Sequence, residues 1–213
     1  MPRDERKRQK ALMKKRSKGK AASQHRSHQP GLTSASPQAM ISRARTFPIF
    51  ECLISDSWQK ENPGLVQILL ARQQPDGDIC FATYLVDKLC LGLKDTFANA
   101  NFSRTRYHNE VRSKISRTTK LVECSPELAH QMIYESIDFA AQFGFQPQKD
   151  FMLSQYLLTP RGELEEPYKL TFGRDGKPFY ISGPHDNPER IMRQLEKTAG
   201  PGNYDYLVGL GPI

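Results

Sequence analysis

The first 45 residues carry most of the positive charge of this chain, and this uneven distribution limits what can fold. Residues 1–45 hold thirteen Lys and Arg against two acidic residues, a net charge of +11, whereas residues 46–213 are slightly acidic at −3. A segment so charged and so poor in apolar side chains cannot bury enough surface to offset its chain entropy. The sequence therefore predicts a disordered basic tail at 1–45 and one folded domain at 46–213.

The pattern of apolar residues and turn signals in the domain predicts an α+β fold with a mainly antiparallel sheet. Strands grouped into hairpins and followed by helices favour this class over a doubly wound parallel sheet. The expected elements are a strand at 48–55, a hairpin at 64–87 around the PDGD turn, helices at 103–118 and 125–144, a short helix near 150–157, a second hairpin at 168–183 around RDGK, and a helix that begins at Asp186 or Asn187. The C-terminal segment after residue 202 is predicted either to add an edge strand or to pack across the surface.

For two of these segments, the residue pattern also predicts how they are buried. Residues 79–87 are apolar on both alternating faces, which predicts a central strand covered on both sides. The segment 125–144 has Ser125 as a helix cap, Pro126 in the first turn and Gly144 at the C-terminal end. Its apolar side chains cover about half of a helical wheel, which predicts a helix packed on the core.

The four cysteines predict buried, reduced thiols. Cys52, Cys80 and Cys90 lie in apolar runs, and neither they nor Cys124 form a CxxC pair. A structural zinc site needs paired ligands at short spacing, so no zinc or other metal is expected. The sequence also lacks phosphate-binding glycine loops and metalloprotease motifs, and no cofactor is predicted.

No stretch approaches the roughly 18 consecutive apolar residues that a membrane span needs. The basic N-terminal segment has no apolar core like that of a secretory signal, although a transit peptide is a remaining alternative. The expected location is cytoplasmic, with no membrane partner.

The tail is the strongest functional signal in the sequence. Clustered cations need a polyanion to neutralise them, and nucleic-acid phosphates do so with release of counterions. RNA is favoured over DNA because such tails bind folded RNA without reading its bases. A solubilising or targeting tail is the alternative. The predicted nucleic-acid-binding residues in the tail are Arg3, Arg6, Lys7, Arg8, Lys10, Lys14, Lys15, Arg16, Lys18, Lys20 and Arg26.

The helix expected from Ser103 carries a second basic patch. Six Lys and Arg against Glu110 lie between residues 103 and 120. Arg106, Arg117 and Lys120 are predicted to lie opposite its apolar seam and to bind nucleic acid with the tail. A charged helix face is often no more than a solvated surface, and that alternative stays open.

Candidates for catalysis are few, and no catalytic residue is predicted. Glu51, Asp87 and Asp95 lie in or beside expected strands, where carboxylates on adjacent strands could hold a divalent metal. His130 is expected to be a hydrogen-bonded core residue. Ser182, His185 and Asp186 are too close in sequence to form a catalytic triad readily.

The function predicted from these observations is that of a non-enzymatic protein associated with RNA or a ribonucleoprotein. The tail contacts phosphates, and the domain positions it. Two alternatives remain: a metal-dependent enzyme acting on nucleic acid or a phosphorylated substrate, and a protein-interaction domain with an incidental tail.

Overall fold

The computed structural model describes residues 35–60, 64–163 and 167–208 of the chain. Most of the predicted basic tail, including its eleven nucleic-acid-binding candidates, lies outside these described residues. The described residues belong to a single unit that begins at Ala35.

A five-stranded antiparallel sheet organises this unit, which confirms the predicted α+β class. Four consecutive strands form a meander, and the fifth strand returns to lie beside the first, so the spatial order is β4-β3-β2-β1-β5. The first hairpin forms as predicted, with Gln73 opposite Ile79 across its turn. The strands are β1 (Ile49–Ser55), β2 (Leu65–Gln73), β3 (Ile79–Asp87), β4 (Gly92–Phe102) and β5 (Leu121–Glu123).

Helices and short helical turns fill the connections between strands. Most of the predicted helices are confirmed, and Ser125 caps α5 by accepting a hydrogen bond from the amide of Leu128 at 3.2 Å. The elements are α2 (Pro37–Ser42), η1 (Ala44–Thr46), η2 (Asp56–Gln59), α3 (Arg104–Tyr107), the π-helical turn η3 (His108–Arg112), α4 (Ser113–Ser116), α5 (Pro126–Gln142), α6 (Phe151–Ser154), η4 (Gln155–Leu157), α7 (Pro188–Thr198) and the short strands β6 (Phe179–Ile181) and β7 (Asp205–Leu207).

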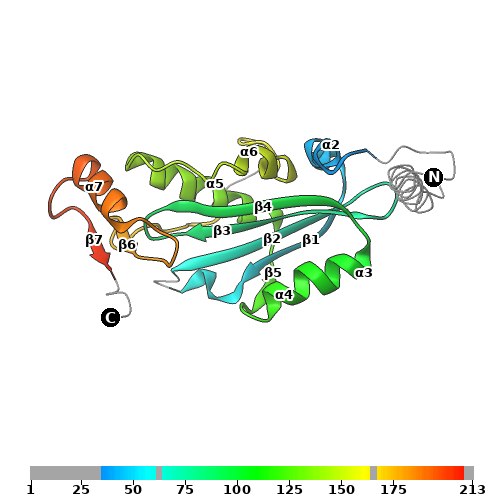
Figure 1. The fold of residues 1–213 in the computed structure, drawn as a ribbon, viewed down its shortest axis with the longest axis horizontal. Helices are drawn as coiled ribbons and strands as arrows, with labels where there is room; N and C mark the ends of the chain where they lie inside the picture. The colour runs from blue at the N-terminus through cyan, green and yellow to red at the C-terminus, as the bar shows by residue number, and fades with distance from the viewer. Residues whose placement is uncertain (1–34, 61–63, 164–166, 209–213) are drawn as a thin grey trace, which may run out of the picture. The chain divides into compact units, whose positions relative to one another are not determined.

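Helices cover both faces of the sheet (Figure 1). Helices α5, α6 and α2 lie on one face, and α3 with α4 lies on the other. The strand β3 shows the consequence, because its alternating side chains enter two separate cores. Cys80 and Tyr84 pack towards α5, whereas Ile79 and Phe81 pack with Tyr107 of α3. The prediction of a central strand covered on both faces is confirmed.

The domain begins earlier than residue 46. Ser36 caps α2 by accepting a hydrogen bond from the amide of Ala39 at 3.3 Å. Ile41 is only 1% exposed, and Ala44 is fully buried in the core on the α5 face. The predicted boundary after residue 45 is therefore wrong for residues 35–45, because a few well-placed apolar side chains in a polar segment are enough to dock one short helix.

The second predicted hairpin does not form a ladder. Its turn is present, with a single antiparallel bridge between Arg174 and Lys177. On the two sides of the turn, the amides of Gly173 and Phe179 donate to the carbonyls of Lys88 and Leu89 in the loop after β3. β6 then pairs in parallel with β7. Competing backbone partners therefore replace the expected hairpin, and the predicted C-terminal edge strand joins β6.

β3 also forms a hairpin with β4 in the main sheet, which the sequence did not reveal. The segment GLKDTFANANF of β4 alternates polar and apolar residues poorly, and β4 is an edge strand. Its register with β3 shifts twice, which marks local bulges. An irregular edge strand leaves only a weak period-two signal.

His130 is buried on α5, at 2% exposure, as expected for a core residue. The predicted hydrogen bond is absent, however, because neither ring nitrogen has a partner within the described part of the chain. Burial, helped by the nearby Arg72, lowers the pKa of His130 to about 4. The ring is therefore neutral at physiological pH and packs as an apolar residue.

Gly92 sets how closely α5 approaches the sheet. Its φ is +68°, and a Cβ atom there would lie 2.6 Å from the Ser136 carbonyl oxygen and 2.7 Å from the Ala140 Cβ. Glycine is the residue that fits both the left-handed backbone and this contact. The turn glycine Gly77 has φ +90°, but a Cβ there would meet nothing within 4 Å.

We expect Gly92→Ala to lower the free energy of unfolding by about 3 kcal/mol, because backbone strain and overpacking of α5 add. Gly77→Ala, which adds strain without a clash, is the matched control and should cost about 1 kcal/mol. Urea unfolding measures both. Equal losses in the two variants would contradict the close packing of α5 on Gly92.

Candidate nucleic-acid interface

The basic helix is placed by the topology of the sheet. α3, η3 and α4 form one continuous helical segment between β4 and β5. Because β4 and β5 are the two edge strands, this segment must cross the sheet from one edge to the other. It covers the face opposite α5 (Figure 1).

Local sequence fixes which side of this segment faces the sheet. The hydroxyl of Ser103 accepts a hydrogen bond from the Arg106 amide at 3.3 Å and so caps the helix as predicted. Tyr107 and Val111 are buried, and Ile115 packs beside them, which confirms the predicted apolar seam. In an α-helix, residues four apart drift by about 40° per step. The π turn has more residues per turn and offsets part of this drift, which keeps the three side chains on one side.

Glu51 of β1 holds the helix on the sheet by two interactions. Its Oε1 accepts a hydrogen bond from the Tyr107 hydroxyl at 2.5 Å, and its Oε2 pairs with Arg112 Nε at 3.0 Å. Burial, together with this hydrogen bond to Glu51, raises the pKa of Tyr107 well above its ordinary value. The phenol is therefore a permanent donor. A carboxylate that accepts two directed bonds fixes both the rotation and the position of the helix.

The outward side of the helical segment and of the turn after it is strongly basic. Exposed cations here are Arg104, Arg106, Lys114, Arg117 and Lys120. Two of them are neutralised, because Arg106 pairs with Glu110 at 3.0 Å and Lys120 pairs with Asp56 at 3.2 Å.

The other three cations, Arg104, Lys114 and Arg117, form no ion pair within the described ranges. Of the predicted residues, Arg106, Arg117 and Lys120 all reach the surface, but Arg117 is the one that remains unneutralised. Lys114 and Arg104 are not among the residues predicted from the sequence to bind nucleic acid. The guanidinium of Arg104 lies over the ring of Phe50, which is 54 residues earlier in the chain. No local sequence pattern could have indicated this contact.

Two arginines of this surface lie over aromatic rings. The guanidinium of Arg106 lies 3.9 Å from the centroid of the Phe102 ring, and that of Arg104 lies 5.3 Å from the centroid of Phe50. Such cation–π contacts contribute about 0.5–1 kcal/mol at exposed sites. They restrict the side chains while both arginines stay exposed. Arg104 has no ion pair, so its guanidinium is available to phosphate oxygens, whereas Arg106 already binds Glu110.

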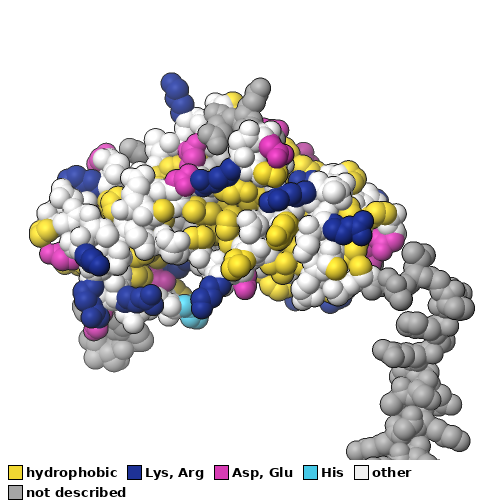
Figure 2. Space-filling view, turned by 90° about the horizontal axis from the view of Figure 1, so that it is seen from above, with side chains coloured by type: hydrophobic (Ala, Val, Ile, Leu, Met, Phe, Trp, Pro, Cys, Tyr) yellow, Lys and Arg dark blue, Asp and Glu magenta, His cyan; other side chains and the backbone are white. Residues whose placement is uncertain are grey.

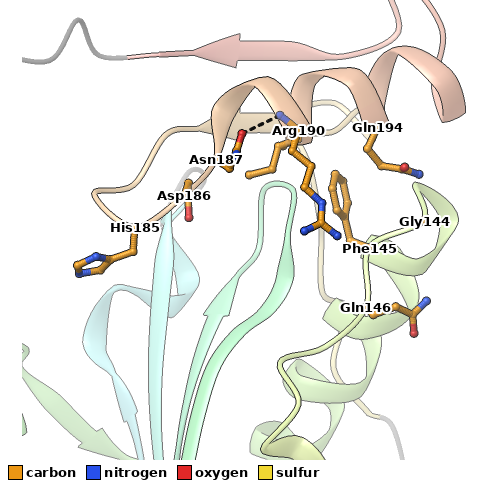
Figure 3. Close-up of a pocket in the computed structure, with 9 residues that line it drawn as sticks. Gly144, Phe145, Gln146, His185, Asp186, Asn187, Arg190 and Gln194 are labelled. Carbon is orange, nitrogen blue, oxygen red and sulfur yellow. Dashed lines mark hydrogen bonds between the residues drawn. The ribbon is translucent and has the colours of Figure 1, made fainter.

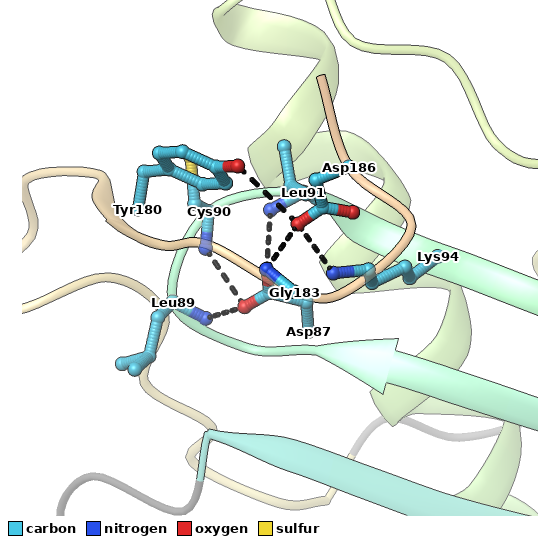
Figure 4. Close-up of polar contacts among 8 residues, drawn as sticks. All are labelled: Asp87, Leu89, Cys90, Leu91, Lys94, Tyr180, Gly183 and Asp186. Atoms are coloured by element: carbon cyan, nitrogen blue, oxygen red, sulfur yellow. Dashed lines mark hydrogen bonds and ion pairs between the residues drawn. The ribbon is translucent and has the colours of Figure 1, made fainter. Parts of the chain in front are cut away.

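The three candidate carboxylates do not converge, and the metal-site hypothesis for them is wrong. Glu51 binds Tyr107 and Arg112. Asp87 is buried at the other end of the sheet, where its oxygens accept hydrogen bonds from the amides of residues 89–91 at 2.8–3.2 Å (Figure 4). Asp95 accepts from the neighbouring Thr96 amide. No cluster of three metal-ligating side chains occurs in the portion of the chain that the structure describes.

Asp186 ties the C-terminal segment to β4 rather than capping α7. Its Oδ2 accepts hydrogen bonds from Lys94 Nζ at 2.8 Å, the Gly183 amide at 2.7 Å and the Tyr180 hydroxyl at 3.3 Å (Figure 4). Burial opposes ionisation, but these donors lower the pKa of Asp186 below its ordinary value. Asn187 is the cap, since its side chain accepts from the Arg190 amide. The Asp186 carboxylate therefore serves to hold the C-terminal segment on the sheet.

A cavity of about 490 Å³ lies between the end of α5 and the start of α7 (Figure 3). Arg190 extends beside the ring of Phe145 in this view. The cavity lining combines one cation and one carboxylate with amides, one imidazole and two apolar side chains. The cavity lies on a different part of the domain from the basic helix. The lining residues are Gly144, Phe145, Gln146, His185, Asp186, Asn187, Arg190, Ile191 and Gln194.

Hydrophobic side chains gather on the face that carries α5 and α6 (Figure 2). Met152 is 77% exposed there. A hollow of about 400 Å³ lies nearby, and Tyr134, Phe151, Arg45 and Arg161 are among the residues that line it. This surface is where a protein partner would bind if the domain were a protein-interaction module, and that alternative stays a prediction.

No protein-family model, curated protein or solved structure matches this chain. Among the described helices, none combines the length and the apolar character that crossing a bilayer requires.

We expect Glu51→Gln to lower the free energy of unfolding by about 2 kcal/mol, because it leaves Arg112 unpaired and weakens the bond from Tyr107. Glu110→Gln removes an exposed pair with Arg106 and should cost less than about 0.5 kcal/mol. Urea unfolding of the two variants compares them at equal change of charge. A loss no larger for Glu51→Gln than for Glu110→Gln would show that Glu51 does not anchor the helix.

Proposed function

We propose that this protein binds RNA, free or within a ribonucleoprotein, without catalysing a reaction. In this proposal the basic face of the α3–α4 segment and the N-terminal basic residues contact the same polyanion. The observation that carries the proposal is the set of three exposed, unpaired cations, Arg104, Lys114 and Arg117, on a helix held rigidly to the sheet. Phosphates attract such a set without any base-specific contact.

The distribution of charge supports a localised interface. The segment 103–120 has a net charge of +5, whereas the rest of 46–213 has a net charge of −8. A polyanion approaching the domain is therefore attracted to one surface and repelled elsewhere. The eleven predicted cations of the tail would add affinity in proportion to the phosphates that they neutralise.

RNA is preferred to DNA on physical grounds. A polybasic segment can follow the irregular, dense phosphate array of folded RNA and order on binding. The helix presents arginines whose guanidinium groups lie over Phe50 and Phe102, which suits shape and phosphate recognition more than reading of base edges.

We expect the triple variant Arg104→Gln, Lys114→Gln, Arg117→Gln to bind a labelled, mixed-sequence structured RNA about tenfold more weakly than the native chain. The slope of log affinity against log salt should decrease by about 2 between roughly 50 and 200 mM salt, because three phosphate contacts are lost. Fluorescence anisotropy measures both quantities. A chain that begins at Ala35 should lose RNA affinity by about a hundredfold or more, because the tail carries more cations than the helix does.

The matched control is Arg190→Gln, Arg193→Gln, Lys197→Gln, which removes the same charge from exposed positions of α7. This control should retain affinity within about twofold if binding is localised. Equal losses in the two triple variants would contradict a localised interface, and native affinity in the helix variant would assign binding to the tail alone. A salt-independent affinity, or none at all, would overturn the proposal.

A further inference from the structure

Cys52 and Cys124 face each other across two neighbouring strands. Leu53 pairs with Glu123 in the β1–β5 ladder, which places Cys52 opposite Cys124 one position along. The Cys124 amide donates to the Cys52 carbonyl at 3.0 Å, and the two sulfurs are 3.5 Å apart. The two thiols therefore share one face of the sheet and contact each other.

The backbone spacing at this position suits a disulfide. Hydrogen-bonded pairs in antiparallel ladders have Cα atoms about 5.5 Å apart. Disulfides span Cα separations of about 4.4–6.8 Å. Closing the sulfurs to bonding distance requires side-chain rotation and a small shift of backbone. β5 is a three-residue strand at the sheet edge, so it can supply that shift.

We propose that Cys52 and Cys124 form a modification site at which hydrogen peroxide, or another hydroperoxide, produces an intramolecular disulfide between β1 and β5. This inference is independent of RNA binding.

The chemistry requires only the two thiols and the peroxide. The thiolate of Cys124 attacks the peroxide and breaks its O–O bond, which gives a sulfenic acid and, after protonation, one water. The sulfur of Cys52 then attacks the Cys124 sulfur, and the departing hydroxide takes the Cys52 proton as a second water. Two thiols are oxidised to one disulfide, and one hydrogen peroxide is reduced to two waters. With another hydroperoxide, the first step releases the corresponding alcohol in place of one water.

The environments of the four cysteines favour this pair and this order. Cys124 is half-buried, whereas Cys52 is 6% exposed and Cys80 and Cys90 are fully buried. The hydrogen bond with Cys124, with burial, raises the pKa of Cys52 far above its ordinary value, so Cys52 is the slower nucleophile towards peroxide. Burial raises the pKa of Cys80 to about 12 and also raises that of Cys90.

The disulfide would cross-link β1 to the segment that connects the basic helix on one face of the sheet with α5 on the other. β5 follows the basic helix, and Cys124 directly precedes Ser125, the cap of α5. Cys52 and Cys124 are 72 residues apart in the chain, so the cross-link closes a long loop. Such a link should raise the urea midpoint of the oxidised protein.

The test is peroxide treatment of the native full-length chain, followed by alkylation under denaturing conditions and tryptic mass spectrometry. The four cysteines fall in four different tryptic peptides, so each pairing is read directly. We expect loss of two of the four alkylatable thiols. The expected linked peptides are 46–60 and 121–149, while Cys80 and Cys90 remain alkylated.

Cys52→Ser and Cys124→Ser should each abolish the linked peptide, and Cys80→Ala should retain it. In Cys52→Ser, Cys124 should accumulate as sulfenic acid and higher oxides, because its partner is absent. Oxidation of Cys124 to sulfinate in the native chain without any 52–124 link would overturn the proposal. So would a link that joins other cysteines or two different chains.

Discussion

The ion pair and hydrogen bond at Glu51 determine how this domain presents its charge. A single carboxylate at the surface of β1 receives Tyr107 and Arg112 from successive turns of the helix that crosses the sheet. Its side chain is 16% exposed, and that of Arg112 is 43% exposed, so the pair lies at the boundary of the core. With one side of the helix held in this way, its remaining cations are directed to solvent as a group.

This arrangement explains why the domain can be acidic overall and still carry a basic surface. Glu51, Glu110 and Asp56 neutralise Arg112, Arg106 and Lys120. The cations that remain lie along one continuous helical segment, which holds them on the same side of the sheet. On the opposite face, α5 rests on Gly92 and encloses the larger core. The structural role of each face is thus distinct, and β5 is the short link between them.

Much of the fold could be predicted from local sequence, since the caps at Ser103 and Ser125, the two-sided apolar pattern of β3 and the turn at Gly77 are local signals. The predictions failed where partners distant in sequence decide the structure. Docking of α2 depends on Ile41 and Ala44 reaching a core built by later strands. The residues after the RDGK turn pair with β7 because α7 returns that strand to them.

At the candidate interface, too, some features follow from local sequence and others depend on distant residues. The basic character of 103–120 and its apolar seam follow from composition and helical spacing. Which cations remain free does not, because it depends on Asp56 and Glu51 and on the stacking of Arg104 on Phe50. From the sequence, Glu51 is a candidate metal ligand and nothing more, since a sequence cannot show that a carboxylate in a strand lies beneath a tyrosine and an arginine of a distant helix.

The most direct test of the account is lysine footprinting of the native chain with an amine-reactive reagent, with and without bound RNA. Lys114 lies on the proposed interface, and Lys197 is also an exposed lysine, on α7. The account predicts that RNA slows modification of Lys114 and leaves Lys197 unchanged. Equal protection of both lysines, or protection of Lys197 alone, would contradict it.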